Sequence, residues 1–321
     1  MIEVKHLTKR YGNHTAVSNL SFTIEKGQIY GFLGPNGAGK STTMNIMTGC
    51  LGATSGEVKI GGFDIFEQPE EAKRLIGFLP ELPPLYLDRT PREYLRFVAE
   101  AKGVAAKDIP AQIDYVMQKA RIVEMADRLI KNLSKGYRQR VGIAQALLGN
   151  PEVIILDEPM VGLDPRQIIE IRDLIQELGK DHTVILSSHI LSEVQAVCTT
   201  VMIIAKGKLI ACDTPENLEK LFTNSNQVNL VVEATKEETE QILSEVAGIK
   251  EFEITVQEDG NCAVKVQGKK DENANICRDL FFAFSRGQRA ILQMNVTKTN
   301  LEEIFIELTS GSKTEPKKEG K

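Results

Sequence analysis

Residues 28–47 read QIYGFLGPNGAGKSTTMNIM, and this stretch decides the fold. The first six residues are short, apolar and nearly unbroken, which is typical of a strand that is covered on both faces. Residues 34–41 then match the complete pattern G-x-x-x-x-G-K-[ST], and a helix is predicted over residues 42–47. This order of strand, loop and helix predicts a phosphate-binding loop within an α/β domain.

The loop contains each group that a bound phosphate needs. Its glycines let backbone N–H groups fold around phosphate oxygens, and the N-terminus of the next helix adds partial positive charge. Lys40 is expected to reach the outer phosphates, and the Ser41 hydroxyl is a ligand for Mg²⁺. A Gly-rich turn without a ligand is the alternative, and the flanking strand and helix argue against it. The predicted nucleotide contacts here are Gly34, Pro35, Asn36, Gly37, Ala38, Gly39, Lys40, Ser41 and Thr42.

A second motif with chemical groups lies at the end of another apolar segment. Residues 153–159 read VIILDEP, so two carboxylates, Asp157 and Glu158, follow a predicted strand. Consecutive strand residues point to opposite faces, so the two carboxylates cannot do the same job. One can hold the Mg²⁺ shell while the other faces an attacking water as general base or orienting group. A solvated loop start is the alternative, and the phosphate-binding loop favours the chemical interpretation.

The first two thirds of the chain alternate apolar strands with helical segments, which is typical of an α/β domain on a mainly parallel sheet. Residues 183–186 (TVIL) and 201–205 (VMIIA) are further predicted strands. The carboxyl ends of such strands line one edge, where ligands of α/β sheets bind. From about residue 85 to 150 helix signals replace strand signals, beginning with Thr90, Pro91 and Glu93 as a helix start. We therefore expect a helical insert there.

The pattern changes after residue 224. A polar break is followed by strand and helix signals in the order βαββαβ, which is typical of a small α+β ferredoxin-like unit, and by a helix predicted over residues 301–308. We predict domains at 1–224 and 225–310, and a disordered tail at 311–321. Phe281, Phe282 and Phe284 are expected in the core of the second domain. This domain could serve dimerisation or docking, sense a small ligand, or only stabilise the protein.

Composition excludes several classes of protein. The chain has 321 residues, 42% apolar and 26% charged, which is typical of soluble globular proteins and not of collagen-like or disordered chains. The longest apolar runs are five residues, against about 20 for a membrane-spanning helix. The start, MIEVKHLTKRY, lacks the apolar core of a signal peptide, and the five cysteines lack C-x-x-C spacing. We expect a cytoplasmic protein without a zinc site.

The net charge of −5 is unevenly distributed. Residues 226–274 carry eleven acidic and five basic side chains, whereas residues 1–225 are close to neutral, with 27 acidic and 26 basic side chains. Neither part is basic, which argues against a nucleic-acid surface as the main function.

A further motif indicates the family. Residues 133–140 read LSKGYRQR and open a predicted helix, so Ser134 and the Gly136 backbone form a second anion-binding helix N-terminus, although Ser134 could be only an N-cap. With this segment, residues 1 to about 220 resemble the ATP-binding cassette (ABC) ATPases. The signature motif of that family typically reads LSGGQ. Lys135 replaces the first glycine and Tyr137 the glutamine. The resemblance implies an N-terminal antiparallel β part beside the mainly parallel core.

The resemblance also implies roles for residues outside the loop. Glu158 and His189, which ends TVILSSH, are the implied catalytic residues, and His189 contacts the γ-phosphate. Tyr11 matches the aromatic residue that stacks on adenine, with Val17 beside it. Without the resemblance, Tyr11 would be read as a packing residue and His189 as a surface or core residue.

Metal and dimer contacts follow from the same resemblance. The implied Mg²⁺ ligands are Ser41, Asp157 and Glu81, and Glu81 in GFLPE stands where the family usually has glutamine. Asp164, in MVGLDP, matches the loop that crosses the dimer interface. Asp164 is also a good helix start, and both readings can hold together.

The implied cofactors are ATP and Mg²⁺, and the implied partner is a second copy or a related ATPase subunit packed head to tail. Residues 34–41 of one subunit and Ser134 and Gly136 of the other then clasp one ATP. The layout with LPE at 79–81 and LEEIFIELT at 301–309 is similar to ATPases of bacterial drug, lipid or gliding-type exporters. That similarity implies a separate membrane permease and a place on the inner face of the cell membrane, with no direct nucleic-acid contact.

Two alternatives stay open. A soluble ABC ATPase that acts on nucleic acid or ribosomes would usually show two cassettes, a long coiled coil or a basic linker. A P-loop kinase or transferase would use residues 34–41 on a small acceptor, and LSKGYRQR and His189 argue against it.

Overall fold

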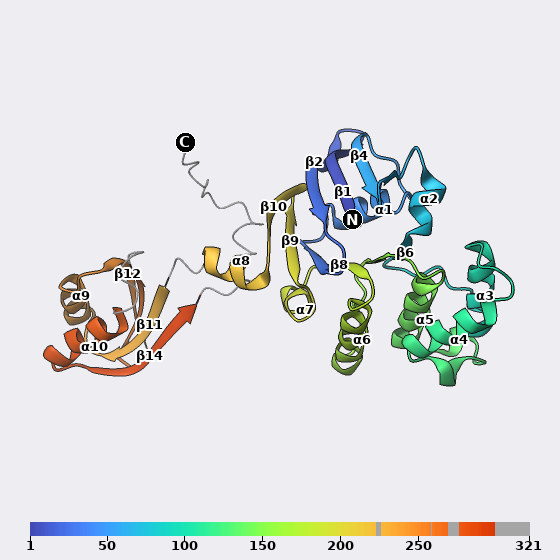
Figure 1. Ribbon diagram of the computed structural model, residues 1–321. Helices are drawn as coiled ribbons and strands as arrows, with labels where there is room; N and C mark the ends of the chain where they lie inside the picture. The colour runs from blue at the N-terminus through green and yellow to red at the C-terminus, as the bar shows by residue number, and fades with distance from the viewer. Residues whose placement is uncertain (223–225, 258, 269–275, 299–321) are drawn as a thin grey trace. The chain divides into compact units, whose positions relative to one another are not determined.

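The computed structural model describes residues 1–222, 226–257, 259–268 and 276–298 (Figure 1). The chain divides into two compact units, Met1–Pro215 and the residues from Glu216 onward. This division lies earlier than the predicted boundary at 224 because helix α8 (Pro215–Phe222) falls almost entirely in the second unit.

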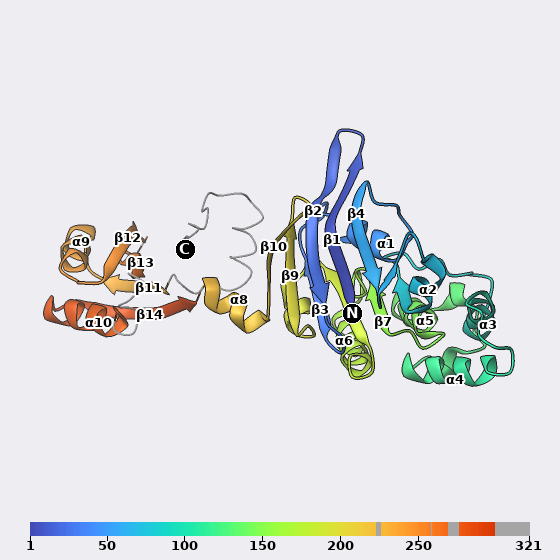
Figure 2. The same ribbon diagram turned by 45° about the horizontal axis from the view of Figure 1, so that its top comes forward.

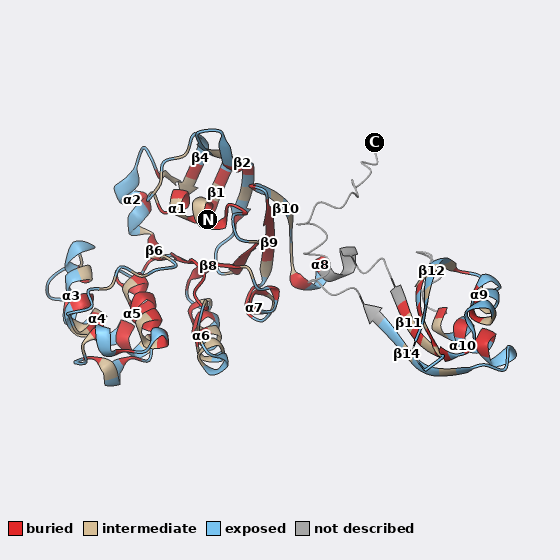
Figure 3. Ribbon diagram, turned by 180° about the vertical axis from the view of Figure 1, so that it is seen from behind, coloured by how far each residue is buried: buried red, intermediate tan, exposed pale blue. Residues whose placement is uncertain are grey.

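A six-stranded sheet forms the centre of the first unit, in the order β10-β9-β3-β8-β7-β6. All neighbouring pairs are parallel except β9 and the edge strand β10, which confirms the mainly parallel core. Nearly every residue of the inner strands is buried, as Figure 3 shows for β8 and β9. The strands are β3 (Ile29–Leu33), β6 (Ile76–Leu79), β7 (Val153–Leu156), β8 (Thr183–Ser188), β9 (Thr200–Ala205) and β10 (Lys208–Asp213).

An antiparallel sheet in the order β2-β1-β4-β5 accompanies it. β1 (Ile2–Tyr11) and β2 (His14–Ile24) form a long hairpin (Figure 2), and β4 (Ser55–Ile60) and β5 (Phe63–Asp64) complete the sheet. Helix α1 (Lys40–Met47) contributes Met44, Ile46 and Met47 to a buried cluster that also contains side chains of both sheets. The helix that follows the phosphate-binding loop is therefore fixed from both sides.

The predicted helical insert lies between β6 and β7. Thr90 and Glu93 form the predicted capping box, in which each side chain accepts a hydrogen bond from the other residue's backbone N–H. Its helices are α3 (Pro91–Ala101), α4 (Ile109–Lys119) and α5 (Lys135–Leu147), with short turns η1 (Val123–Met125) and η2 (Ile130–Asn132). The remaining helices of this unit are α2 (Pro69–Arg74), α6 (Pro165–Leu178) and α7 (Leu191–Gln195).

The second unit has the predicted order of elements. Its antiparallel sheet runs β12-β13-β11-β14, so β13 lies between the two strands that α9 joins, as in a split βαβ unit. Alternating residues Val228, Leu230 and Val232 of β11 pack in one apolar core with both helices. The elements are β11 (Asn226–Glu233), α9 (Lys236–Ser244), β12 (Ile249–Val256), β13 (Cys262–Gly268), α10 (Ile276–Arg286) and β14 (Ala290–Lys298).

The aromatic cluster of α10 corrects one prediction. Phe284 is fully buried, but Phe281 and Phe282 are 55% and 49% exposed. The helix buries Ile276, Leu280 and Phe284, which are spaced four residues apart and therefore share one face. Phe281 and Phe282 lie outside that buried face of the helix, and their rings contact each other edge to face.

Two predictions, the helix at 301–308 and the tail at 311–321, lie outside the described residues. Within the described ranges, no helix is both long enough and apolar enough to cross a membrane.

Candidate functional site

The phosphate-binding loop connects β3 to α1 at the carboxyl edge of the parallel sheet. Lys40 is the first residue of α1, and its side chain folds back over the loop. Its Nζ donates to the Gly34 carbonyl oxygen at 2.8 Å and lies 3.4 Å from that of Pro35. The Lys40 side chain is only 5% exposed, and its ammonium group lies over the loop where phosphate oxygens would bind.

Two glycines of the loop are required by its geometry. A Cβ at Gly34 would lie 2.3 Å from the Ile204 carbonyl oxygen. Gly39 has φ +104°, in the left-handed region, and a Cβ there would lie 2.5 Å from the Ala16 carbonyl oxygen. The loop is thus packed against the backbone of β2 and β9, and its shape is fixed before any ligand binds.

Asp157 follows β7 and faces the start of α1. Its Oδ1 accepts hydrogen bonds from the Ser41 hydroxyl at 3.1 Å and from the Ser187 hydroxyl at 2.6 Å. The carboxylate is buried, so these two bonds offset part of its desolvation.

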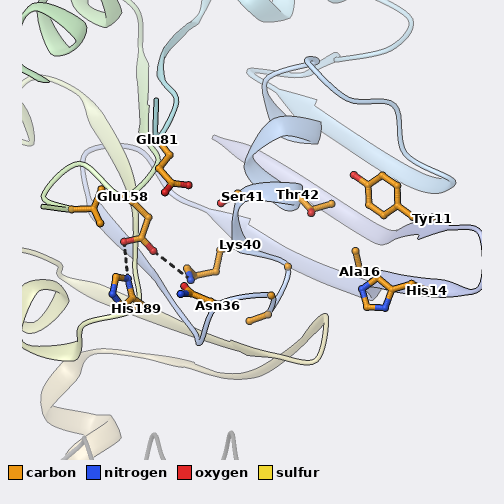
Figure 4. Close-up of a pocket in the computed structure, with 14 residues that line it drawn as sticks. Tyr11, His14, Ala16, Asn36, Lys40, Ser41, Thr42, Glu81, Glu158 and His189 are labelled. Carbon is orange, nitrogen blue, oxygen red and sulfur yellow. Dashed lines mark hydrogen bonds and ion pairs between the residues drawn. The ribbon is translucent and has the colours of Figure 1, made fainter. Parts of the chain in front are cut away.

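Glu158 has different partners from Asp157, although both residues lie beyond the end of β7, so strand alternation is not the cause. Its Oε1 lies 3.5 Å from Lys40 Nζ and its Oε2 lies 3.0 Å from His189 Nδ1 (Figure 4). The backbone has φ +48°, which is unusual for a residue with a side chain, and its N–H donates to the Ser187 hydroxyl at 2.8 Å. Strained backbone of this kind concentrates at functional sites.

Lys40, Ser41, Glu158 and His189 line one cavity of about 480 Å³, and Asp157 does not reach its surface. Glu158, His189 and Glu81 lie at one end of it, and Tyr11 and His14 lie at the other, beyond the loop (Figure 4). The structure thus brings the predicted adenine-stacking residue and the predicted catalytic residues to one cavity. The lining residues are Tyr11, His14, Ala16, Asn36, Gly37, Ala38, Gly39, Lys40, Ser41, Thr42, Glu81, Glu158, Val161 and His189.

Val17 differs from its predicted place. Its side chain is fully buried in the core, and the neighbouring Ala16 lines the cavity instead. Val17 Cγ2 would lie 3.5 Å from a Cβ at Gly39, so this side chain supports the loop from beneath.

The oxygen donors around the loop suit a Mg²⁺ ion. The Ser41 hydroxyl and the Asp157 carboxylate are in direct contact, and the exposed Glu81 carboxylate faces the same cavity. Mg²⁺ binds to one or two carboxylates and to phosphate oxygens and keeps several waters, so this small, hard donor set fits it.

The predicted signature residues do not line the cavity. Ser134 is the N-cap of α5, and its hydroxyl accepts from the Tyr137 N–H at 3.4 Å. Asp164 is the N-cap of α6 and accepts from the Gln167 N–H at 2.9 Å. A Cβ at Gly136 would lie 2.7 Å from Gln167 Cδ, so the starts of α5 and α6 are in contact. Ser134, Gly136 and Asp164 therefore lie at the adjoining starts of α5 and α6, outside the cavity of their own chain.

The two departures from the usual signature have contacts of their own. The Tyr137 hydroxyl donates to Glu124 at 3.1 Å, and partial burial together with this bond raises the pKa of Tyr137. Lys135 Nζ lies against Gly162, since a Cβ there would be 2.2 Å away. Tyr137 thus connects the start of α5 to η1, and Lys135 connects it to the loop at Gly162.

Comparisons with known proteins identify the family. The sequence model of the ABC transporter family matches residues 17–161, which include the phosphate-binding loop and both adjacent carboxylates. The chain is 34% identical to the bacitracin transport ATP-binding protein BcrA of Bacillus licheniformis, over 97% of this chain and 98% of that protein. This chain belongs to the ABC transporter ATP-binding proteins.

Two further relatives extend this assignment. The linearmycin resistance ATP-binding protein LnrL of Bacillus subtilis is 30% identical, over 96% of this chain and 98% of its own length. A solved structure described as a dimeric post-hydrolysis state of the ATP-binding cassette MJ0796, bound to ADP and Pi, superimposes with a TM-score of 0.60 and 25% identity, over 67% of this chain and 98% of that chain. ABC proteins bind ATP, and the cassette fold is the part that this structure shares.

Some residues of this ABC cassette site were not predicted. The Ser187 hydroxyl donates to the Asp157 carboxylate and accepts from the Glu158 backbone N–H, and Ala16 and His14 line the cavity. Ser187 carries a sequence signal, because a polar residue at the end of an apolar strand lies at the ligand-binding edge. Ala16 and His14 carry none, since their place depends on how β2 packs beside the loop.

Proposed function

We propose that this chain is the ATP-hydrolysing subunit of an ABC exporter and powers a separate membrane permease through ATP-driven, head-to-tail dimerisation. One observation carries the proposal: Lys40, Glu158 and His189, from three separate elements, meet at the end of a cavity that the phosphate-binding loop lines. The names of BcrA and LnrL support transport of, and resistance to, antibiotics as the task of relatives.

The catalytic step uses the carboxylate that is freed when a nucleotide binds. In the structure, Lys40 contacts Glu158 and two loop carbonyls. A triphosphate competes for the Lys40 ammonium group, and Glu158 is then available to accept the proton of the attacking water. His189, in contact with Glu158, orients that carboxylate and contacts the γ-phosphate. Ser41 and Asp157, with Glu81 nearby, would hold a Mg²⁺ ion, which would supply positive charge against the phosphates.

The second half of each site comes from the partner subunit. Ser134 and Gly136 start a helix whose N-terminus suits an anion, yet they lie outside the cavity of their own chain. In a head-to-tail dimer, Ser134 and Gly136 complete the ATP site of the other subunit. Asp164 then lies in a loop at the interface between the two subunits. Tyr11 stacks on the adenine. The subunit works at the cytoplasmic face of the membrane against its permease.

Trapping the dimer tests this function. Glu158→Gln retains the side-chain volume but cannot accept the proton, so ATP and Mg²⁺ should hold this variant as a dimer on size-exclusion chromatography. Wild-type protein, which hydrolyses the ATP, should return to its nucleotide-free elution volume. A Glu158→Gln variant that binds ATP but stays monomeric would contradict the proposed dimer mechanism.

A further inference from the structure

A third buried carboxylate lies beside the catalytic site. Among the described residues, only Asp157, Glu158 and Glu193 combine a carboxylate with less than a tenth of their surface exposed. The first two already have roles in hydrolysis. Glu193, on α7, is 5% exposed and does not line the cavity. Burying a carboxylate is costly unless it is hydrogen-bonded, so the hydrogen-bond partner of Glu193 indicates the role of this residue.

That partner is Ser188, the last residue of β8. The Ser188 hydroxyl is fully buried and donates to Glu193 Oε2 at 2.6 Å. The same hydroxyl accepts from the Ile190 backbone N–H at 3.0 Å. Since Ser188 and Ile190 flank His189, this pair of hydrogen bonds closes the turn from which the histidine projects.

Ser187, the residue before Ser188, makes hydrogen bonds on the other face of β8. Ser187 and Ser188 are consecutive in β8, so their side chains point to opposite faces. Ser187 bonds to the Asp157 carboxylate and to the Glu158 N–H, whereas Ser188 bonds to α7. The Ser188 carbonyl oxygen also accepts from the Gly34 N–H at 3.4 Å, which links the same residue to the phosphate-binding loop.

α7 itself is held tightly against the sheet. A Cβ at Gly31 of β3 would lie 2.3 Å from Val194 Cγ1 and 2.8 Å from Cys198 Sγ. The residue next to Glu193 therefore packs directly on the strand that leads into the phosphate-binding loop. Because α7 is packed against the sheet, Glu193 has a fixed position on this helix and can hold Ser188 in place.

We propose that Glu193 is a positioning residue for hydrolysis. Through Ser188 it holds the turn that presents His189 to Glu158, without touching nucleotide itself. The proposal rests on the proposed function, because it needs His189 to act on the γ-phosphate. Small displacements of a reacting group lower the rate of the chemical step far more than they weaken binding of substrate.

Two truncations and one conservative substitution test it in the full-length protein. Glu193→Ala and Ser188→Ala should each lower kcat for ATP about 10- to 100-fold, with KM for ATP changed by no more than about twofold. The double variant should be no slower than the slower single variant, because the two residues act as one unit. Glu193→Gln keeps an oxygen that accepts from Ser188, so it should retain kcat within about threefold of wild type.

A matched control separates positioning from general destabilisation. His182 is buried just before β8, at the opposite end of the strand, and its Nδ1 lies 2.8 Å from the Pro151 carbonyl oxygen. His182→Leu should lower the melting temperature yet leave kcat per folded molecule unchanged. If Glu193→Ala and Ser188→Ala keep wild-type kcat, or if His182→Leu loses kcat to the same degree, Glu193 has no positioning role.

The two proposals fail in different ways. Wild-type protein without ATPase activity, or a Glu158→Gln variant that is as active as wild type, would overturn the proposed function. An inactive Glu158→Gln variant beside fully active Glu193→Ala and Ser188→Ala variants would overturn only the role of Glu193.

Discussion

The two units of this chain bury polar groups very differently. The first unit buries a lysine, three carboxylates and two serines where β3, β7 and β8 end. Among the described residues of the second unit, Thr239 is the one buried polar side chain, and its hydroxyl donates to the Thr235 carbonyl at 2.8 Å. Both units nonetheless have closed apolar cores.

This difference separates what holds the fold from what performs the reaction. Buried charges destabilise a protein unless they are paired, so a fold has no thermodynamic reason to collect them at one edge. The second unit shows that a sheet with two helices needs none of them. The cluster at the first unit's edge therefore supports the proposed catalytic site.

The largest effect is expected at Glu158. Glu158→Gln should lower ATP turnover by about 10²- to 10⁴-fold, because the amide cannot act as a general base. Phosphate release under saturating ATP and Mg²⁺ measures it. The matched control is Glu177→Gln, which changes a partly exposed carboxylate that pairs with Lys119 away from the cavity, and this variant should turn over ATP like wild type. Equal activity of both variants would break the contrast.

The next effect concerns the core of the second unit. Phe284→Ala should lower the free energy of unfolding of that unit by about 3–5 kcal/mol, because it removes a fully buried ring. Phe281→Ala, on the exposed side of the same helix, should change it by less than about 0.5 kcal/mol. Urea unfolding followed by circular dichroism gives both values. Similar losses for the two variants would contradict the described face of α10.

A smaller effect is expected in the phosphate-binding loop. Gly39→Ala must adopt φ near +104° and meets the Ala16 carbonyl, so it should cost about 1–3 kcal/mol of stability and weaken ATP binding. Gly52→Ala is the control, since a Cβ there meets nothing within 4 Å and the residue has no positive φ. Calorimetric melting and titration with ATP compare them. A stable Gly39→Ala variant with normal affinity would show that the loop is not fixed beforehand.

Local signals in the sequence predicted much of this molecule. Residues 28–47 and residues 153–159 each combine an apolar strand pattern with the polar groups of the site. The structure has the expected strands and loop there. The order βαββαβ was also readable, because each element has its own apolar period. These features depend on neighbours in the chain and not on distant contacts.

What could not be predicted depends on packing between distant segments. Residues 280–284 read LFFAF, which is apolar on every side of a helix, so only the sheet beneath decides which rings are buried. Ala16 reaches the cavity, and Val17 does not, because β2 lies against the loop at Gly39. The Ser188–Glu193 bond needs α7 to fold back on β8, and no period in the sequence reports that contact.

In the proposed dimer, each ATP site combines the phosphate-binding loop of one subunit with Ser134 and Gly136 of the other. Mixing two inactive variants tests it most directly. Lys40→Ala removes the phosphate grip, and Ser134→Glu places a negative charge at the start of α5, so each variant alone should have little ATPase activity. An equimolar mixture should regain ATP hydrolysis well above either variant, because its mixed dimers contain one intact site. A mixture no more active than its components would contradict the account.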